Sequence, residues 1–183
     1  AAIYRDRWPD QAIRIISIAS LSTPSFWLAM LLIQALGHKV GLVSLLPTSG
    51  RLPAMTDNFG GWLLRMLLPA VALAVPVIGQ LSRVVRTAVV EELDKDYVRT
   101  ALGAGIPRHV VVGRNVLRNA LITPITVLGL RIGYLLGGAV IIEIIFNING
   151  MGMLIMNGVT NNEPNLVQGV TLTVALAFVV INT

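Results

Sequence analysis

Few residues in this chain have the type and spacing needed for bond-making chemistry. The sequence has no cysteine, which excludes thiol catalysis and zinc sites with cysteine ligands. The two histidines, His38 and His109, are isolated, are expected on opposite sides of a membrane, and have no nucleophile or base partner. Neither an H-E-x-x-H zinc motif nor a G-x-x-x-x-G-K-[ST] phosphate-binding loop occurs. We therefore expect no catalytic site, no metal and no ATP or other cofactor held by this chain itself.

Two charged residues stand within or beside a long apolar segment. Arg131 lies in its middle, where an ionisable group costs about 3 kcal/mol and is a candidate functional residue. Two interpretations have equal weight: Arg131 faces a water-filled path and attracts a carboxylate there, or it packs against a polar group of a partner subunit. Glu143 lies at the segment's edge, roughly 18 Å away along a helix, so the two cannot pair within it.

The most polar part of the chain runs from Glu91 to Asn119 and separates two apolar segments. Seven of the 14 Lys+Arg residues lie between Arg83 and Arg118. Within this stretch, apolar residues at i, i+4 spacing predict a short helix over 96–104. Asp94 and Asp96 are expected to cap its start, and Gly105 and Pro107 to end it. We expect a second helix to follow, with an apolar face made of Val110, Val111, Leu117 and Leu121.

Composition places the chain in a membrane. Hydrophobic residues make up 55% of the 183 residues, charged residues 13%, and the mean hydropathy is +0.76. Uncharged stretches of bilayer length predict an all-α membrane protein with about four spans. Pro24, Pro76 and Pro124 are expected to kink or break three of them. The predicted spans are residues 13–37, 65–88, 119–145 and 165–183, and the predicted connecting loop is 89–118.

The distribution of basic residues predicts the orientation. Ten Lys+Arg residues lie in the N-terminal stretch and the 83–118 region, and three lie in the loops expected on the other side. Basic residues favour the cytoplasmic side, so the Glu91–Asn119 stretch should face the cytoplasm. The net charge of +5 could suggest nucleic acid, but the bases are sorted by segment, which argues against a nucleic-acid partner.

Several motifs carry a resemblance to a known family. DYVRTALGAG at 96–105 and VLRNALIT at 116–123 resemble the coupling loop of bacterial ABC importer permeases. They are similar to the sequence pattern that the dipeptide/oligopeptide branch of this family has in the loop. LLPTSGR at 45–51 and GGAVIIEIIFNINGMG at 137–152 resemble the same branch, which usually has proline where this chain has Asn149. Compared with six-span permeases of this branch, the chain corresponds to spans three to six, and we interpret it as a fragment with both ends missing.

The resemblance implies a fold, a function and partners. The fold would be a polytopic α-helical bundle of the type I ABC importer permease kind, in the bacterial inner membrane. Its function would be to form the translocation path of an ATP-driven peptide importer. Partners would be a second related permease, two ATPase subunits or domains that bind ATP and Mg, an extracytoplasmic peptide-binding protein and the lipid bilayer.

The resemblance also assigns residues. Contact with the ATPase would involve Asp96, Tyr97, Arg99, Thr100, Ala101 and Gly105, and the outer connection would involve Glu143, Gly150 and Gly152. Peptides, nickel and glutathione stay open as the solute. A secondary transporter or channel without an ATPase is the alternative function, although such proteins usually carry a carboxylate near the midplane, which is absent from the predicted spans. A membrane-embedded enzyme is disfavoured because no nucleophile and base occur together.

Overall fold

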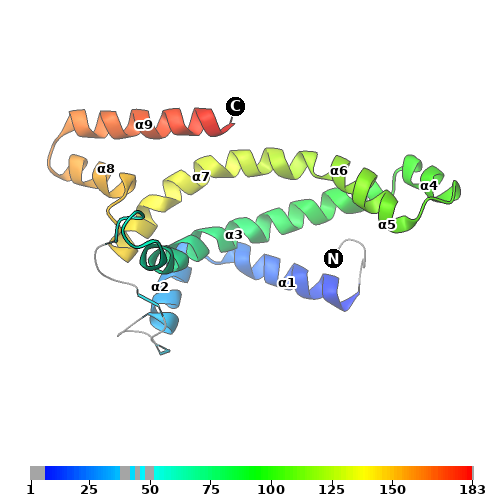
Figure 1. Ribbon diagram of the computed structural model, residues 1–183, viewed down its shortest axis with the longest axis horizontal. Helices are drawn as coiled ribbons and strands as arrows, with labels where there is room; N and C mark the ends of the chain where they lie inside the picture. The colour runs from blue at the N-terminus through cyan, green and yellow to red at the C-terminus, as the bar shows by residue number, and fades with distance from the viewer. Residues whose placement is uncertain (1–6, 38–41, 44–45, 48–51, 183) are drawn as a thin grey trace. The chain divides into compact units, whose positions relative to one another are not determined.

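The computed structural model describes residues 7–37, 42–43, 46–47 and 52–182, and Figure 1 shows their arrangement. His38, Lys39, Arg51 and most of the motif at 45–51 lie outside the described residues. Within the described ranges every regular element is helical, and the one β-bridge is an isolated pair between Gly37 and Leu46. The prediction of an all-α protein is confirmed.

The described residues form helices of very different lengths. In chain order they are α1 (Trp8–Ser22), α2 (Ser25–Leu36), α3 (Phe59–Leu93), α4 (Asp96–Gly103), α5 (Arg108–Val110), the π-helix η2 (Val111–Val116), α6 (Leu117–Ala120), α7 (Ile122–Phe146), α8 (Met151–Thr160) and α9 (Pro164–Asn182). They divide between two compact units: residues 1–22 with 77–130 form the first unit, and 23–76 with 131–183 form the second.

The first unit contains α1, the C-terminal half of α3, the short helices α4 to α6 and the start of α7. Its core is a cluster of small branched side chains from α3, α4, η2 and α6: Val89, Val98, Val111, Val116 and Ala120. Helix α1 approaches α3 closely at Gly79, where an added Cβ atom would lie 2.8 Å from the Cβ of Ser20 and 2.9 Å from the carbonyl oxygen of Ser17. The absence of a side chain at Gly79 therefore permits this contact.

The second unit contains α2, the N-terminal half of α3, most of α7, and helices α8 and α9. Its core brings together Ala29, Leu68, Ala72, Ile142 and Phe146 from α2, α3 and α7. Nearer the N-terminus of α7 than these core residues, a Cβ atom at Gly133 would lie 2.8 Å from the Phe178 ring of α9, so α7 and α9 also make close contact.

Apolar surface remains exposed in both units. Three helices of the described residues, α3, α7 and α9, are long and apolar enough to cross a membrane. The bent pair of helices α1 and α2 would be a fourth span if the two helices together form a single span. In α9 no described residue is buried within the chain. Such surface suits contact with lipid or with other membrane helices. The limits predicted for the four spans stay predictions.

The prolines act differently from one another. Helix α1 ends at Ser22 and α2 begins at Ser25, so the predicted kink at Pro24 is an interruption of the helix. Helix α3 continues through Pro76. In the third predicted span, α6 ends at Ala120 and α7 begins at Ile122, with Pro124 in its first turn, so the regular helix is interrupted just before this proline, which cannot donate to the carbonyl of Ala120.

The segment 147–163 contains more structure than its composition predicts. The segment lies between the predicted spans 119–145 and 165–183 and is rich in glycine and asparagine, and ten of its residues form helix α8. Asn147 and Asn162, with φ angles of 51° and 56°, make the left-handed turns at the end of α7 and after α8. Asparagine tolerates this conformation better than most residues, because its short polar side chain bonds locally.

Candidate functional site

Helix α4 is the helix predicted between Asp96 and Ala104, and its existence is confirmed. Its start differs from the expectation, because Lys95 occupies the N-cap position and makes no side-chain capping bond. The N-cap position is therefore not an aspartate, as we had expected. Asp96 is instead the first helical residue, where its negative charge favours the positive end of the helix dipole. Its ion pair with Arg99, 3.8 Å long and exposed, adds little stability.

The end of α4 follows the expected glycine pattern. Gly105 has a φ of 81°, its N–H donates to the carbonyl of Leu102 at 3.0 Å, and the N–H of Ile106 donates to the carbonyl of Ala101 at 3.2 Å. These two bonds form a Schellman motif, which satisfies carbonyls that the helix leaves unpaired. The next helix begins at Arg108 directly after Pro107. The predicted sharp break is confirmed.

One face of α4 packs inward. Val98 is buried, and Tyr97 and Ala101 are half-buried against the core of the first unit. Leu102, four residues after Val98, is exposed. Two residues predicted to touch an ATPase, Tyr97 and Ala101, therefore contribute to holding α4 in place within its own chain.

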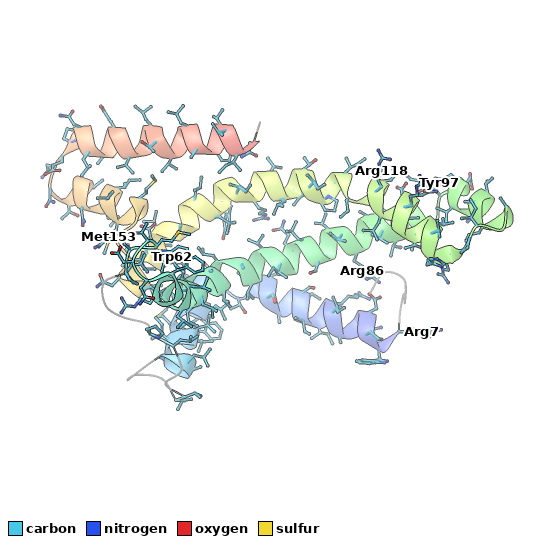
Figure 2. The ribbon with its side chains drawn as sticks, viewed as in Figure 1. Arg7, Trp62, Arg86, Tyr97, Arg118 and Met153 are labelled. Atoms are coloured by element: carbon cyan, nitrogen blue, oxygen red, sulfur yellow. The ribbon has the colours of Figure 1, made fainter. Side chains whose placement is uncertain are left out.

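A polar cluster joins α4 to the ends of two other helices, and we name it the Glu92 cluster: Glu92 of α3, Lys95, Tyr97 of α4 and Asn119 of α6. The Glu92 carboxylate is buried; it accepts a hydrogen bond of 2.9 Å from the Tyr97 hydroxyl and pairs with Lys95 at 2.7 Å. The amide of Asn119 donates to the Tyr97 oxygen at 3.5 Å. Figure 2 shows Tyr97 at this end of the unit.

The surroundings of the Glu92 cluster keep its donors protonated. Burial raises the pKa of Tyr97, and the hydrogen bond to Glu92 raises it further. The hydrogen bond with Glu92 also raises the pKa of Lys95. Sequence reasoning missed this cluster, because its members come from α3, α4, α6 and the turn between α3 and α4. The available signal was the tyrosine hydroxyl on the face of α4 that packs inward.

Several residues of α4 and of the turn after it are exposed to solvent. Arg99, Thr100, Leu102 and Ile106 are exposed, the last two at 42% and 41%. The Thr100 hydroxyl donates to a carbonyl of its own helix at 3.1 Å, so it makes no link to the rest of the unit. Apolar surface flanked by Arg99 is the kind of surface that a partner protein covers.

The helix expected after Pro107 consists of three short pieces, α5, η2 and α6. Val111 and Val116 are buried as core residues, whereas Val110 and Leu117, which we placed on the apolar face, are exposed. A π-helical turn changes the register of a helix by shifting hydrogen bonds to i→i+5, so a constant helical period misassigns part of the face. Sequence reasoning gave no signal for it.

Arg131 lies in the second unit, half-buried on α7. Its guanidinium lies over the ring of Tyr134, with 5.3 Å from the Cζ atom to the ring centroid. This cation–π contact between residues three apart gives the charge an aromatic partner within its own helix. That Arg131 also contacts a solute stays a prediction.

Glu143 connects α7 to the start of α8. Its carboxylate Oε2 accepts a hydrogen bond of 2.8 Å from the N–H of Met153, a residue labelled in Figure 2. Gly150 and Gly152 lie against this carboxylate, and a Cβ atom at Gly152 would also lie 2.7 Å from the Cα of Val140. The structure thus brings together the three residues predicted for the outer connection. A carboxylate at the N-terminus of α8 satisfies a backbone donor there and complements its dipole.

No group of three or more His, Asp or Glu side chains that could hold a metal ion occurs among the described residues.

Comparison with known proteins agrees with this architecture. Residues 1–183 match the family described as the inner membrane component of binding-protein-dependent transport systems. The chain is 37% identical to a putative peptide transport system permease protein of Brucella suis and to one of Brucella abortus, over 182 residues. It is 36% identical to the glutathione transport system permease protein GsiC of Escherichia coli.

These matches cover 100% of this chain but only 56% to 57% of the three relatives, so the chain spans little more than half of their length. The family match, which covers every residue, and the apolar helices point to the same conclusion. This chain belongs to the family of inner membrane components of binding-protein-dependent transport systems.

Proposed function

We propose that this chain is part of the transmembrane permease of an ATP-driven importer, and that α4 is the helix on which an ATPase subunit acts. The observation that carries the proposal is the two-sided construction of α4. One side of α4 is held in the first unit by Val98 and the Glu92 cluster, while Arg99 and Leu102, near its C-terminal end, are exposed to solvent.

This construction suits a part that transmits force. A helix pushed by a partner moves the rest of its unit only if it cannot rock on its own support. The Tyr97–Glu92 bond and the buried Val98 side chain link α4 to α3, and the Schellman motif at Gly105 ends it sharply. Closure of an ATPase dimer would then shift α3 and the helices packed on it, and the permease would alternate between two openings.

We further propose short peptides as the solute. Two of the relatives are named for peptide transport and the third for glutathione, which is itself a small peptide. Arg131 is the candidate for attracting a solute carboxylate, because it is the charged side chain in the middle part of α7. A second related permease, two ATPase subunits or domains that bind ATP and Mg, and an extracytoplasmic binding protein would complete the complex.

The test compares two substitutions at one exposed position. Leu102→Asp places a charge where α4 would meet the ATPase, whereas Leu102→Met keeps an apolar side chain of similar size. Removing a buried leucine contact costs about 1.5–3 kcal/mol, so we expect at least about tenfold weaker ATPase binding for Leu102→Asp. The measurement is copurification of the ATPase with the complete permease, together with uptake of labelled dipeptides.

Each result has a clear meaning. Loss of ATPase and uptake in Leu102→Asp, with both kept in Leu102→Met, supports the proposal. If the complete wild-type permease takes up peptides without any associated ATPase, it is a secondary transporter or channel instead. If Leu102→Asp retains ATPase and uptake at the wild-type level, the exposed face of α4 is not the docking surface.

A further inference from the structure

A cavity of about 300 Å³ lies between α1 and α3, entirely within the first unit. It contains none of the residues assigned to ATPase docking, to the solute or to the outer connection. Its lining combines guanidinium groups, hydroxyl groups and apolar side chains: Ile13, Arg14, Ser17, Ile18, Ser82, Arg83, Arg86 and Thr87.

Two contacts fix the walls of this cavity. On one side of it, α1 meets α3 at Gly79, where the helices approach to backbone contact. On the other side, Arg86 of α3 binds the buried Asp10 of α1 through two hydrogen bonds, Nε to Oδ1 at 2.7 Å and Nη2 to Oδ2 at 2.6 Å. Figure 2 labels Arg86 on α3. Because both ends are held, the space between the helices exists before any ligand enters it.

The charges around the cavity favour an anion. Asp10 balances the charge of Arg86. Arg14 and Arg83 line the same cavity, and no acidic side chain of the described residues lies within ion-pair distance of either. Guanidinium groups present several N–H donors in a planar fork that matches the oxygens of a phosphate. The cavity therefore has an excess of about two positive charges and the donors that a phosphate requires.

The apolar side chains of the cavity indicate that its ligand also has an apolar part. Ile13 and Ile18 line it and are 40% and 55% exposed, and the neighbouring Ile15 and Ile16 are 67% and 64% exposed. Inorganic phosphate makes no use of such surface, whereas acyl chains do. Trp8, 80% exposed at the start of α1, is the residue type that gathers at membrane interfaces. Arg14 follows it by roughly 9 Å along the helix.

We propose that this cavity binds the phosphate of an anionic phospholipid in the cytoplasmic leaflet, with an acyl chain lying along Ile13 and Ile18. Arg14 and Arg83 hold the phosphate, and Arg86 keeps the two helices at the separation that the headgroup needs. Basic pockets between membrane helices on the cytoplasmic side commonly bind anionic headgroups. The proposal is independent of ATPase docking, since it depends only on α1 and α3.

The experiment uses the complete permease complex in phosphatidylcholine nanodiscs, titrated with spin-labelled phosphatidylglycerol. Electron paramagnetic resonance measures the fraction of label that is motionally restricted. The double variant Arg14→Gln/Arg83→Gln should bind phosphatidylglycerol about 30-fold more weakly, or about fivefold for each arginine. Ile18→Trp fills the cavity without changing the charge and should also remove the restricted fraction.

The matched control is Arg114→Gln/Arg118→Gln, which removes the same charge from exposed positions elsewhere in the first unit. It should leave lipid binding unchanged. If the control lowers binding as much as the cavity variant, the attraction is diffuse and the proposal is wrong. If the cavity variant binds phosphatidylglycerol like the wild type, it is also wrong. Full displacement of the lipid by inorganic phosphate, at matched ionic strength, would assign the site to free phosphate instead.

Discussion

The hydroxyl of Tyr97 offers a sharp test of whether α4 is held by the Glu92 cluster. Tyr97→Phe removes the hydrogen bond of 2.9 Å to Glu92 and the longer one of 3.5 Å from Asn119, and leaves the ring in its packing position. A hydrogen bond to a charged group contributes about 1.5–3 kcal/mol. The lower value applies here because Glu92 keeps its ion pair with Lys95 and is not left without a partner. We therefore expect about a tenfold increase in local opening of α4.

Hydrogen–deuterium exchange of the complete complex measures this opening directly. Peptides covering α4 should lose about tenfold in protection, and those covering α9 should not change. Tyr134→Phe is the matched control, since it removes the same group from an exposed ring of the second unit. If α4 links ATP hydrolysis to transport, Tyr97→Phe should also lower peptide uptake per ATP hydrolysed while the ATPase stays bound. Unchanged exchange of α4 would refute the role given to the Glu92 cluster.

The effect should also be constant from about pH 6 to about pH 9. The pKa values of Tyr97 and Lys95 are both raised, so each group binds its proton more tightly in the folded state than in the unfolded state. Their contribution to stability is fully present below their ordinary pKa values, 10.0 and 10.5, and is lost only as the pH rises above them. If the effect of Tyr97→Phe disappears anywhere between about pH 6 and about pH 9, this assignment is contradicted.

Three further substitutions test other contacts. Gly105→Ala should cost about 1–2 kcal/mol, because its left-handed conformation disfavours a Cβ atom, and should raise hydrogen exchange at the end of α4; unchanged exchange would argue against strain there. Gly152→Val should lower the thermal transition of the purified complex, because its side chain collides with the backbone of Val140, whereas Gly137→Val, at a position with open space, should not. Arg131→Ala should reduce peptide uptake more than Arg131→Lys does, and normal uptake of every peptide by both variants would remove Arg131 from the solute path.

Local signals were sufficient to predict α4 and its end. An i, i+4 apolar stripe, Gly105 and Pro107 lie within a dozen residues, and each acts through the backbone next to it. The same is true of the Arg131–Tyr134 contact, whose spacing of three residues was readable in the sequence although it was not used.

Other features depend on contacts between distant residues, and the sequence could not reveal them. The Glu92 cluster needs α3 to continue as far as Leu93 and α6 to bring Asn119 beside it. Asp10 looked like an ordinary charge of a polar terminus, but Arg86, 76 residues later, buries and neutralises it. Helix α8 was not predicted within 147–163, a segment whose glycine and asparagine residues are also typical of turns; Gly150 and Asn161 are the caps of this helix.

Helix α9 has a consequence for how the protein is made and handled. Nineteen residues long and with no described residue buried by its own chain, it presents apolar surface that lipid or further protein must cover. Whatever covers this surface stabilises the folded chain by mass action, so the melting temperature should rise with the concentration of that lipid or protein. Chains whose α9 stays uncovered would be early substrates for membrane quality-control proteases.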